Sequence, residues 1–259
     1  MSSSVEEIFS TETGHGPLVL LLHGQPGTHE DLDAIFDRLS SFTTVVSVDR
    51  PGYGSSGAAP CSIAAQVAII AELLASRGDG PAVVVGHSFG GAVALVLAAE
   101  HPELVAGIVL LGSVGGAGSI GSLDHLLALP AVGSIASWLS LSAYGLFGPI
   151  VARIGDRHEL AANVPLSPRI GLTHSLTSFL VDQRALLDEW PLIEQAVSNV
   201  ACHALVIHGS IDTIVPLAAG LDLADRLRDS TLVVIDGVGH LISRDAPDRV
   251  VSEFRAHFA

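Results

Sequence analysis

The sequence predicts a doubly wound, mostly parallel α/β sheet into which a helical cap is inserted. Three observations favour this class: six short apolar runs, helical spacing in the segments between them, and one long interruption of that alternation. The runs are continuous and rich in Val, Ile and Leu, which is typical of parallel strands covered on both faces. They are Leu18–Leu22, Thr43–Val48, Ala82–Val85, Val105–Leu111, Ala204–Ile207 and Thr231–Ile235.

The segments between these runs carry apolar residues at helical spacing. Ser62 suits the N-cap of a helix and Gly78 suits its C-terminal stop, so we expect a helix between them. The helical segments are 28–39, 62–78, 216–227 and 245–254. A weaker apolar run, Val5–Phe9, indicates an additional edge strand.

The interruption covers residues 114–197, and its stretch from 126 to 152 has no charged residue. Pro130 and Pro149 break that stretch, whereas a membrane span needs about 20 uninterrupted apolar residues. We therefore expect an inserted helical cap whose inner face lines an apolar pocket, with most of its leucines serving as added core. The expected organisation is a core domain over 1–113, the cap over 114–197 and the rest of the core over 198–259.

Charge and composition exclude several classes of partner. The formal net charge is −15, which argues against binding nucleic acid or an anionic membrane surface. The sequence contains no lysine, so Schiff-base chemistry and lysine-held phosphates are excluded. Cys61 and Cys202 are too few and too far apart in sequence for a metal site. We expect no cofactor and no metal.

The N-terminal segment has no basic stretch followed by an apolar one, so no secretory signal is visible. A cytoplasmic location is the resulting expectation. No membrane span is expected, and the apolar half of the cap leaves a homodimer contact open.

Ser88 is the strongest candidate for a catalytic residue. It lies in Gly86-His87-Ser88-Phe89-Gly90, directly after a predicted strand and directly before a small-residue run of helical character. The two glycines remove side chains that would block a sharp strand-to-helix turn. A serine hydroxyl on such a turn is exposed to a base and can act as a nucleophile.

An activated serine needs a base, and the base needs an orienting acid. His240 follows the last predicted strand in Gly-Val-Gly-His240-Leu, and Asp212 follows the preceding strand in Gly-Ser-Ile-Asp212. Both leave the carboxyl ends of strands, where open α/β sheets place their sites. Asp236 is the rival acid, but it lies only four residues before His240.

The transition state also needs preorganised donors for the developing oxyanion. One is expected to be the backbone N–H of Phe89, at the start of the helix after the nucleophile. The other is expected from the loop His23-Gly24-Gln25-Pro26-Gly27, where Gln25 has an N–H to give and Pro26 has none. Asp49 and Arg50 are interpreted as structural residues that hold neighbouring loops.

These segments together resemble the α/β-hydrolase superfamily, in its capped, serine-nucleophile branch of carboxylesterases and lactonases. The motifs H-G-x-P-G, D-R-P-G-Y-G, G-H-S-F-G-G, G-x-x-D and G-H-L occur in that family's order and cover almost the whole chain outside the cap. The resemblance implies Ser88 as nucleophile, His240 as base, Asp212 as orienting acid, and Gln25 with Phe89 as the oxyanion hole. It does not specify a substrate.

Departures from the pattern narrow the field. Haloalkane dehalogenases and epoxide hydrolases of similar loop sequence have an aspartate where this chain has Ser88, and dehalogenases place a tryptophan where Phe89 stands. Bacterial meta-cleavage hydrolases of C–C bonds usually have a tryptophan after the catalytic histidine, where this chain has Leu241, which disfavours that reaction but leaves it as an alternative.

The leading hypothesis is a serine hydrolase acting on a small to medium apolar ester or lactone. One alternative is hydrolysis of a C–C bond in a vinylogous diketone, or another cofactor-free reaction of the same triad. Another is a receptor-like protein that only binds its ligand. For each candidate residue of the acyl pocket, the competing interpretation is that it only packs in the hydrophobic core. The candidates are Phe89, Trp138, Tyr144, Phe147, Phe179 and Trp190.

Overall fold

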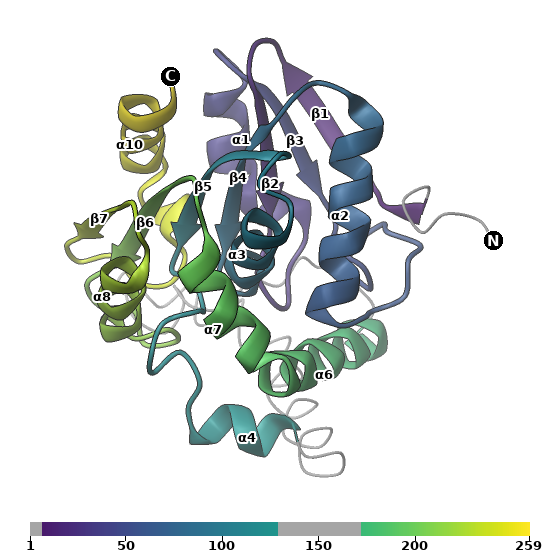
Figure 1. Cartoon of the computed structure of the whole chain (residues 1–259). Helices are drawn as coiled ribbons and strands as arrows, with labels where there is room; N and C mark the ends of the chain where they lie inside the picture. The colour runs from purple at the N-terminus through teal and green to yellow at the C-terminus, as the bar shows by residue number, and fades with distance from the viewer. Residues whose placement is uncertain (1–6, 129–171) are drawn as a thin grey trace, which may run out of the picture.

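The fold is built on one twisted sheet (Figure 1). The computed structural model describes residues 7–128 and 172–259. Within them the strand order is β1-β3-β2-β4-β5-β6-β7, with β1 antiparallel to β3 and every other pair parallel. The strands are β1 (Ser10–Gly14), β2 (Leu18–Leu22), β3 (Thr44–Val48), β4 (Ala82–His87), β5 (Val105–Leu111), β6 (His203–Gly209) and β7 (Ser230–Ile235).

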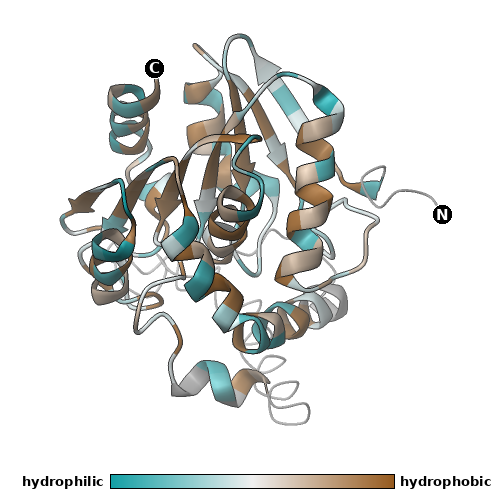
Figure 2. Cartoon of the chain, viewed as in Figure 1, coloured by the Kyte–Doolittle hydropathy of each residue, from teal (hydrophilic) through white to brown (hydrophobic). Residues whose placement is uncertain are grey.

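Helices cover both faces of the sheet because successive strand side chains point to opposite sides. In β2, Leu20 packs into the core on one face of the sheet, whereas Leu21 packs into the core on the other face. Strands β2 to β7 are accordingly apolar along most of their length (Figure 2). The helices are η2 (His29–Leu32, a 3-10 helix), α1 (Asp33–Leu39), α2 (Ile63–Arg77), α3 (Phe89–Glu100), α8 (Leu217–Arg226), α9 (Ile242–Asp245) and α10 (Pro247–Phe258).

The six predicted central strands are confirmed, and the predicted edge strand is wrong. The edge strand is β1, with the polar sequence Ser-Thr-Glu-Thr-Gly, and no strand covers the described part of Val5–Phe9. An edge strand that is mostly exposed needs no apolar run, so hydropathy did not reveal it. The helix caps are confirmed: Ser62 Oγ accepts from the Ala65 N–H at 3.2 Å, and Gly78 is left-handed with φ of 69°.

The segment between β5 and β6 contains three described helices: α4 (Ser122–Ala128), α6 (Leu172–Asp188) and α7 (Trp190–Asn199). In Figure 1, α4 and α6 lie beyond the carboxyl ends of the strands, while α7 runs alongside α3 and packs against it. Residues 129–171 are outside the described part, so the predicted extent of the cap stays a prediction. None of the described helices is long and apolar enough to cross a membrane.

Helix α3 approaches the sheet closely at a glycine. A Cβ built on Gly90 would lie 2.3 Å from the carbonyl oxygen of Leu22, inside the van der Waals distance. Because that contact is with backbone of a central strand, the strand cannot yield without disturbing its ladder.

We therefore predict that Gly90→Ala lowers the free energy of unfolding by about 1–3 kcal/mol through overpacking. Gly121→Ala is the matched control, since its Cβ would meet only an Asp124 oxygen at 3.8 Å; a change within about 0.5 kcal/mol is expected there. Urea unfolding measures both, and equal losses in the two variants would contradict the prediction.

Candidate active site

Ser88 occupies a strained turn between β4 and α3. Its φ of 53° and ψ of −117° make it the one non-glycine residue with positive φ in the described part of the chain. A Cβ on Gly86 would lie 2.5 Å from the carbonyl oxygen of Gly90, so only glycine fits beneath this turn. The Ser88 N–H donates to the carbonyl of Leu111, which ties the turn to the end of β5 at 3.0 Å. Backbone strain held by such surroundings is typical of functional sites.

Asp212 and His240 form a buried pair. Asp212 follows β6 and His240 follows β7, and the His240 Nδ1–H donates to Asp212 Oδ2 at 2.8 Å. The other Asp212 oxygen accepts from the N–H groups of Ile214 and Val215 at 2.9 and 3.0 Å. With Nδ1 protonated, the neutral imidazole has its lone pair on Nε2, which is the atom a general base uses.

The surroundings of Asp212 keep it ionised. Burial raises its pKa, but the hydrogen bond and charge of His240 and the two backbone N–H groups outweigh burial, and the pKa lies below its usual value. An ionised Asp212 stabilises the imidazolium that forms when His240 takes a proton.

Gly112 brings this pair close to the Ser88 turn. It follows β5 with a φ of 50°, and a Cβ there would lie 3.2 Å from both Asp212 Oδ2 and His240 Nδ1. The preceding residue, Leu111, is the one that holds the Ser88 N–H. The Ser88 turn, Asp212 and His240 therefore share the carboxyl edge of the sheet.

His87 links the turn to the loop that carries His240. Its Nε2–H donates to the His240 carbonyl at 3.0 Å, and the centres of the two rings lie 4.8 Å apart. Burial first, and then the neighbouring His240, lower the pKa of His87 to about 3. The side chain is thus a neutral donor at physiological pH, and it holds the backbone of the loop that carries His240.

The loop after β2 lies against Ser88. A Cβ on Gly24 would be 3.1 Å from Ser88 Cβ, and the next peptide bond, Gln25–Pro26, is cis. Within the described residues, no hydrogen bond is found from the backbone N–H of Gln25 or of Phe89. Phe89 directly follows Ser88, and Gln25 directly follows Gly24, so both N–H groups belong to segments that adjoin Ser88.

A buried arginine supports this loop. The Arg50 guanidinium donates to the carbonyls of His23 and Gly24 at 2.9 and 2.8 Å and lies 4.6 Å from the centre of the Phe89 ring. It also pairs with Asp182 of α6 at 2.9 Å, and both side chains are almost fully buried. The structural role predicted for Arg50 is confirmed.

Sequence reasoning missed the residues of α6 that meet the core. Asp182 accepts from Tyr53 Oη at 2.7 Å as well as from Arg50, and Gln66 of α2 bridges Arg50 and Asp182. The next residue, Gln183, accepts from the Gln25 side chain. Asp182 and Gln183 stand in a helix of mixed polar and apolar sequence, and their partners lie far away in sequence, so no local signal marked them.

The structure places two of the predicted pocket residues. Phe179 is half-buried on α6, and Trp190 is half-buried at the start of α7, packed against the core under α3. Their contact with substrate stays a prediction. Trp138, Tyr144 and Phe147 lie outside the described residues.

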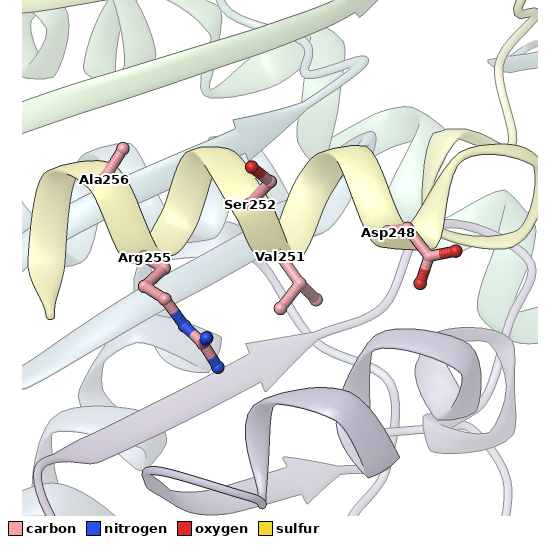
Figure 3. Close-up of a pocket in the computed structure, with 5 residues that line it drawn as sticks. All are labelled: Asp248, Val251, Ser252, Arg255 and Ala256. Atoms are coloured by element: carbon pink, nitrogen blue, oxygen red, sulfur yellow. The ribbon is translucent and has the colours of Figure 1, made fainter.

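A separate surface hollow of about 450 Å³ lies along α10 (Figure 3). Asp248, Val251 and Arg255 point to one side of the helix, and Ser252 and Ala256 point to the other. None of these residues is among the site candidates, so this hollow is distinct from the expected acyl pocket. In the described ranges, no cluster of three or more His, Cys, Asp or Glu residues suited to a metal ion is found.

Known proteins share this architecture. The sequence model described as "Alpha/beta hydrolase family" matches residues 19–253. A pimeloyl-[acyl-carrier protein] methyl ester esterase of Neisseria meningitidis is 30% identical over 243 residues, which cover 86% of this chain and 85% of that protein.

Two solved structures show the same fold at lower identity. Est816, described as an N-acyl homoserine lactone degrading enzyme, superposes with a TM-score of 0.72 at 21% identity, covering 97% of this chain and 96% of that one. A meta-cleavage product hydrolase of Pseudomonas fluorescens gives 0.68 at 24% identity, covering 96% and 94%.

The fold and the paired loops at the carboxyl edge of the sheet define an α/β enzyme of the hydrolase type. The chain belongs to the α/β-hydrolase family, and its curated relatives include esterases.

The neutral state of His87 makes stability depend on pH. The pKa in the folded state is about 3, against about 6.5 in the unfolded chain. As the pH falls from 6.5 towards 3 the unfolded chain takes up this proton and the folded chain does not. The free energy of unfolding therefore falls, by about 1.4 kcal/mol per pH unit from this group.

We predict that His87→Gln, which keeps an N–H donor, reduces that slope by about this amount in urea titrations at several pH values. The exposed His15→Gln is the matched control, because it makes the same replacement at a solvated position of the chain. An unaltered slope in His87→Gln would contradict the assignment.

The Arg50–Asp182 pair gives a second prediction. Asp182→Asn leaves a buried guanidinium without its counter-charge and is expected to lower the free energy of unfolding by about 3 kcal/mol. Asp188→Asn, an exposed position on the same helix, is expected to change it by less than about 0.5 kcal/mol. Denaturant unfolding compares them, and a loss below about 1 kcal/mol in Asp182→Asn would refute the role given to the pair.

Proposed function

We propose that the protein is a cofactor-free serine hydrolase that cleaves small to medium apolar esters or lactones through an acyl-enzyme on Ser88. The observation that carries this is the 2.8 Å hydrogen bond between Asp212 and His240, at the sheet edge where Ser88 occupies its strained turn. Chemistry on an ester carbonyl requires a nucleophile, a base, an acid that orients the base and an oxyanion hole.

In the proposed reaction, Ser88 Oγ attacks the carbonyl carbon while His240 Nε2 takes its proton. The negative charge that develops on the carbonyl oxygen is stabilised by the N–H groups of Gln25 and Phe89. His240 then returns the proton to the leaving alcohol, which departs and leaves the acyl-enzyme. A water molecule, activated by the same imidazole, releases the acid and restores Ser88.

The class of substrate is supported by the relatives and by composition. The Neisseria relative is by name a methyl ester esterase, and the structural neighbour Est816 degrades a lactone according to its description. Residues 126–152 carry no charge, in keeping with an apolar acyl pocket under the cap. Of the described residues, Phe179 and Trp190 are the candidates for the wall of that pocket.

The test is covalent labelling with a fluorophosphonate probe together with an ester panel. Wild-type protein is expected to label at Ser88 and to turn over nitrophenyl esters, and Ser88→Ala is expected to lose labelling and at least about 10³-fold in kcat. Ser113→Ala is the matched control, a buried serine whose Oγ donates to the Val114 carbonyl, and it is expected to retain both. A folded wild type that does not label would overturn the acyl-enzyme.

The same panel separates the competing functions when it includes a vinylogous diketone and lactones. High turnover of the diketone with poor ester turnover would indicate C–C bond hydrolysis by the same residues. Stabilisation of the fold by a ligand without turnover of any panel member would indicate a receptor.

A further inference from the structure

Three side chains form a hydrogen-bonded chain from α4 to the loop beside Ser88. Gln25 Nε2 donates to Gln183 Oε1 at 2.5 Å, and Gln183 Nε2 donates to Asp124 Oδ1 at 3.1 Å. The chain joins residues separated by 158 and 59 positions in sequence, and Gln183 at its centre is 1% exposed. It therefore couples the loop of the candidate oxyanion hole to two helices inserted between β5 and β6.

We propose that Asp124 and Gln183 orient the Gln25 side-chain amide so that its Oε1 accepts a hydrogen bond from an N–H or O–H group of the substrate near the scissile carbonyl. This inference rests on the proposed function and names a preferred substrate class for the same site.

The carboxylate of Asp124 determines which group donates and which accepts in each of these hydrogen bonds. Its Oδ2 accepts from the Gly121 N–H at 2.7 Å, and its Oδ1 faces Gln183. A carboxylate can only accept, so Gln183 must turn its Nε2 to Asp124 and its Oε1 to Gln25. Gln25 must then turn its own Nε2 to Gln183, which leaves Gln25 Oε1 facing away from Gln183.

That oxygen lacks a donor. Gln25 Oε1 is buried, and no hydrogen bond to it is found within the described residues. The next residue, Pro26, has no N–H to offer, and a buried acceptor without a partner is costly. Since a Cβ on the neighbouring Gly24 would lie 3.1 Å from Ser88 Cβ, this acceptor belongs to the same loop turn that contacts the nucleophile.

The chemistry that satisfies it is a hydrogen-bond donor on the substrate. Acyl groups with a hydroxyl or an amide N–H close to the ester carbonyl supply one, whereas plain alkyl acyl groups leave Oε1 unsatisfied. A site built to bond a donor discriminates against an analogue that lacks it, because its own polar group is then left unpaired.

Asp124→Asn tests the direction directly. The asparagine oxygen can keep the Gly121 N–H, but its NH₂ group now faces Gln183. Gln183 must turn its Oε1 towards it, and Gln25 must then turn its Oε1 to Gln183 and present Nε2 instead. The substitution thus exchanges the free acceptor for a free donor with almost no change in shape.

A second substitution restores the original direction. In Asp124→Asn/Gln183→Glu, one oxygen of the introduced glutamate accepts from the introduced asparagine amide, and the other accepts from Gln25 Nε2, so Gln25 Oε1 is free again. Asp188→Asn, the same replacement at an exposed position of α6, is the control.

The probes are nitrophenyl esters of 2- and 3-hydroxybutanoic acid, each paired with the ester in which methyl replaces the hydroxyl. For wild type and Asp188→Asn, kcat/KM is expected to favour one hydroxy ester over its partner by about tenfold. The ratio is expected to fall to about one or below in Asp124→Asn and to recover in the double variant. If Asp124 and Gln183 had a structural role alone, the substitutions would lower kcat/KM equally for both esters of a pair.

Labelling of Ser88 by fluorophosphonate is measured in every variant and separates the two proposals. Without labelling or ester turnover in the wild type, the proposed function itself fails. With labelling intact, ratios that are the same in wild type, Asp124→Asn and the double variant overturn the inference and show that Gln25 Oε1 takes an ordered water or no partner.

Discussion

The site depends on the hydrogen bonds and the ion pair of one buried guanidinium, that of Arg50. A cation removed from water must have its N–H groups paired, and breaking one such pair costs far more than its formation gains. Arg50 finds acceptors in the loop after β2, in α2 through Gln66 and in α6 through Asp182, and its plane lies over Phe89. Because each partner belongs to a different element, one side chain fixes their relative positions.

The hydrogen bonds of Arg50 also fix the backbone of the loop next to Ser88. The Gly24 carbonyl that Arg50 holds belongs to the same planar peptide unit as the Gln25 N–H, so the direction of that N–H is fixed as well. His87, the residue before Ser88, donates to the carbonyl of His240 and so holds the loop that carries it. Groups fixed in advance need no reorganisation as charge develops, which is how an oxyanion hole contributes most.

Much of this arrangement could be predicted from local signals. The continuous apolar runs indicated the central strands, and the glycines around Ser88 indicated the turn that its φ of 53° confirms. Asp212 and His240 were selected because residues after parallel strands meet at one edge, and they are hydrogen-bonded there. The edge strand β1 escaped because it is polar and mostly exposed, so its partner β3, and not its own hydropathy, makes it a strand.

The sequence by itself determined the class of fold and the candidate residues Ser88, Asp212 and His240. Apolar runs, turn glycines and the position of a residue directly after a strand can all be recognised within short segments. Only the tertiary structure decided which residues of α6 meet the site. Asp182 lies 132 positions from Arg50, and Gln183 lies 158 positions from Gln25. Nothing in their neighbourhood distinguishes them from solvated polar residues, because a buried polar group is defined by the partner that satisfies it, and packing alone supplies that partner.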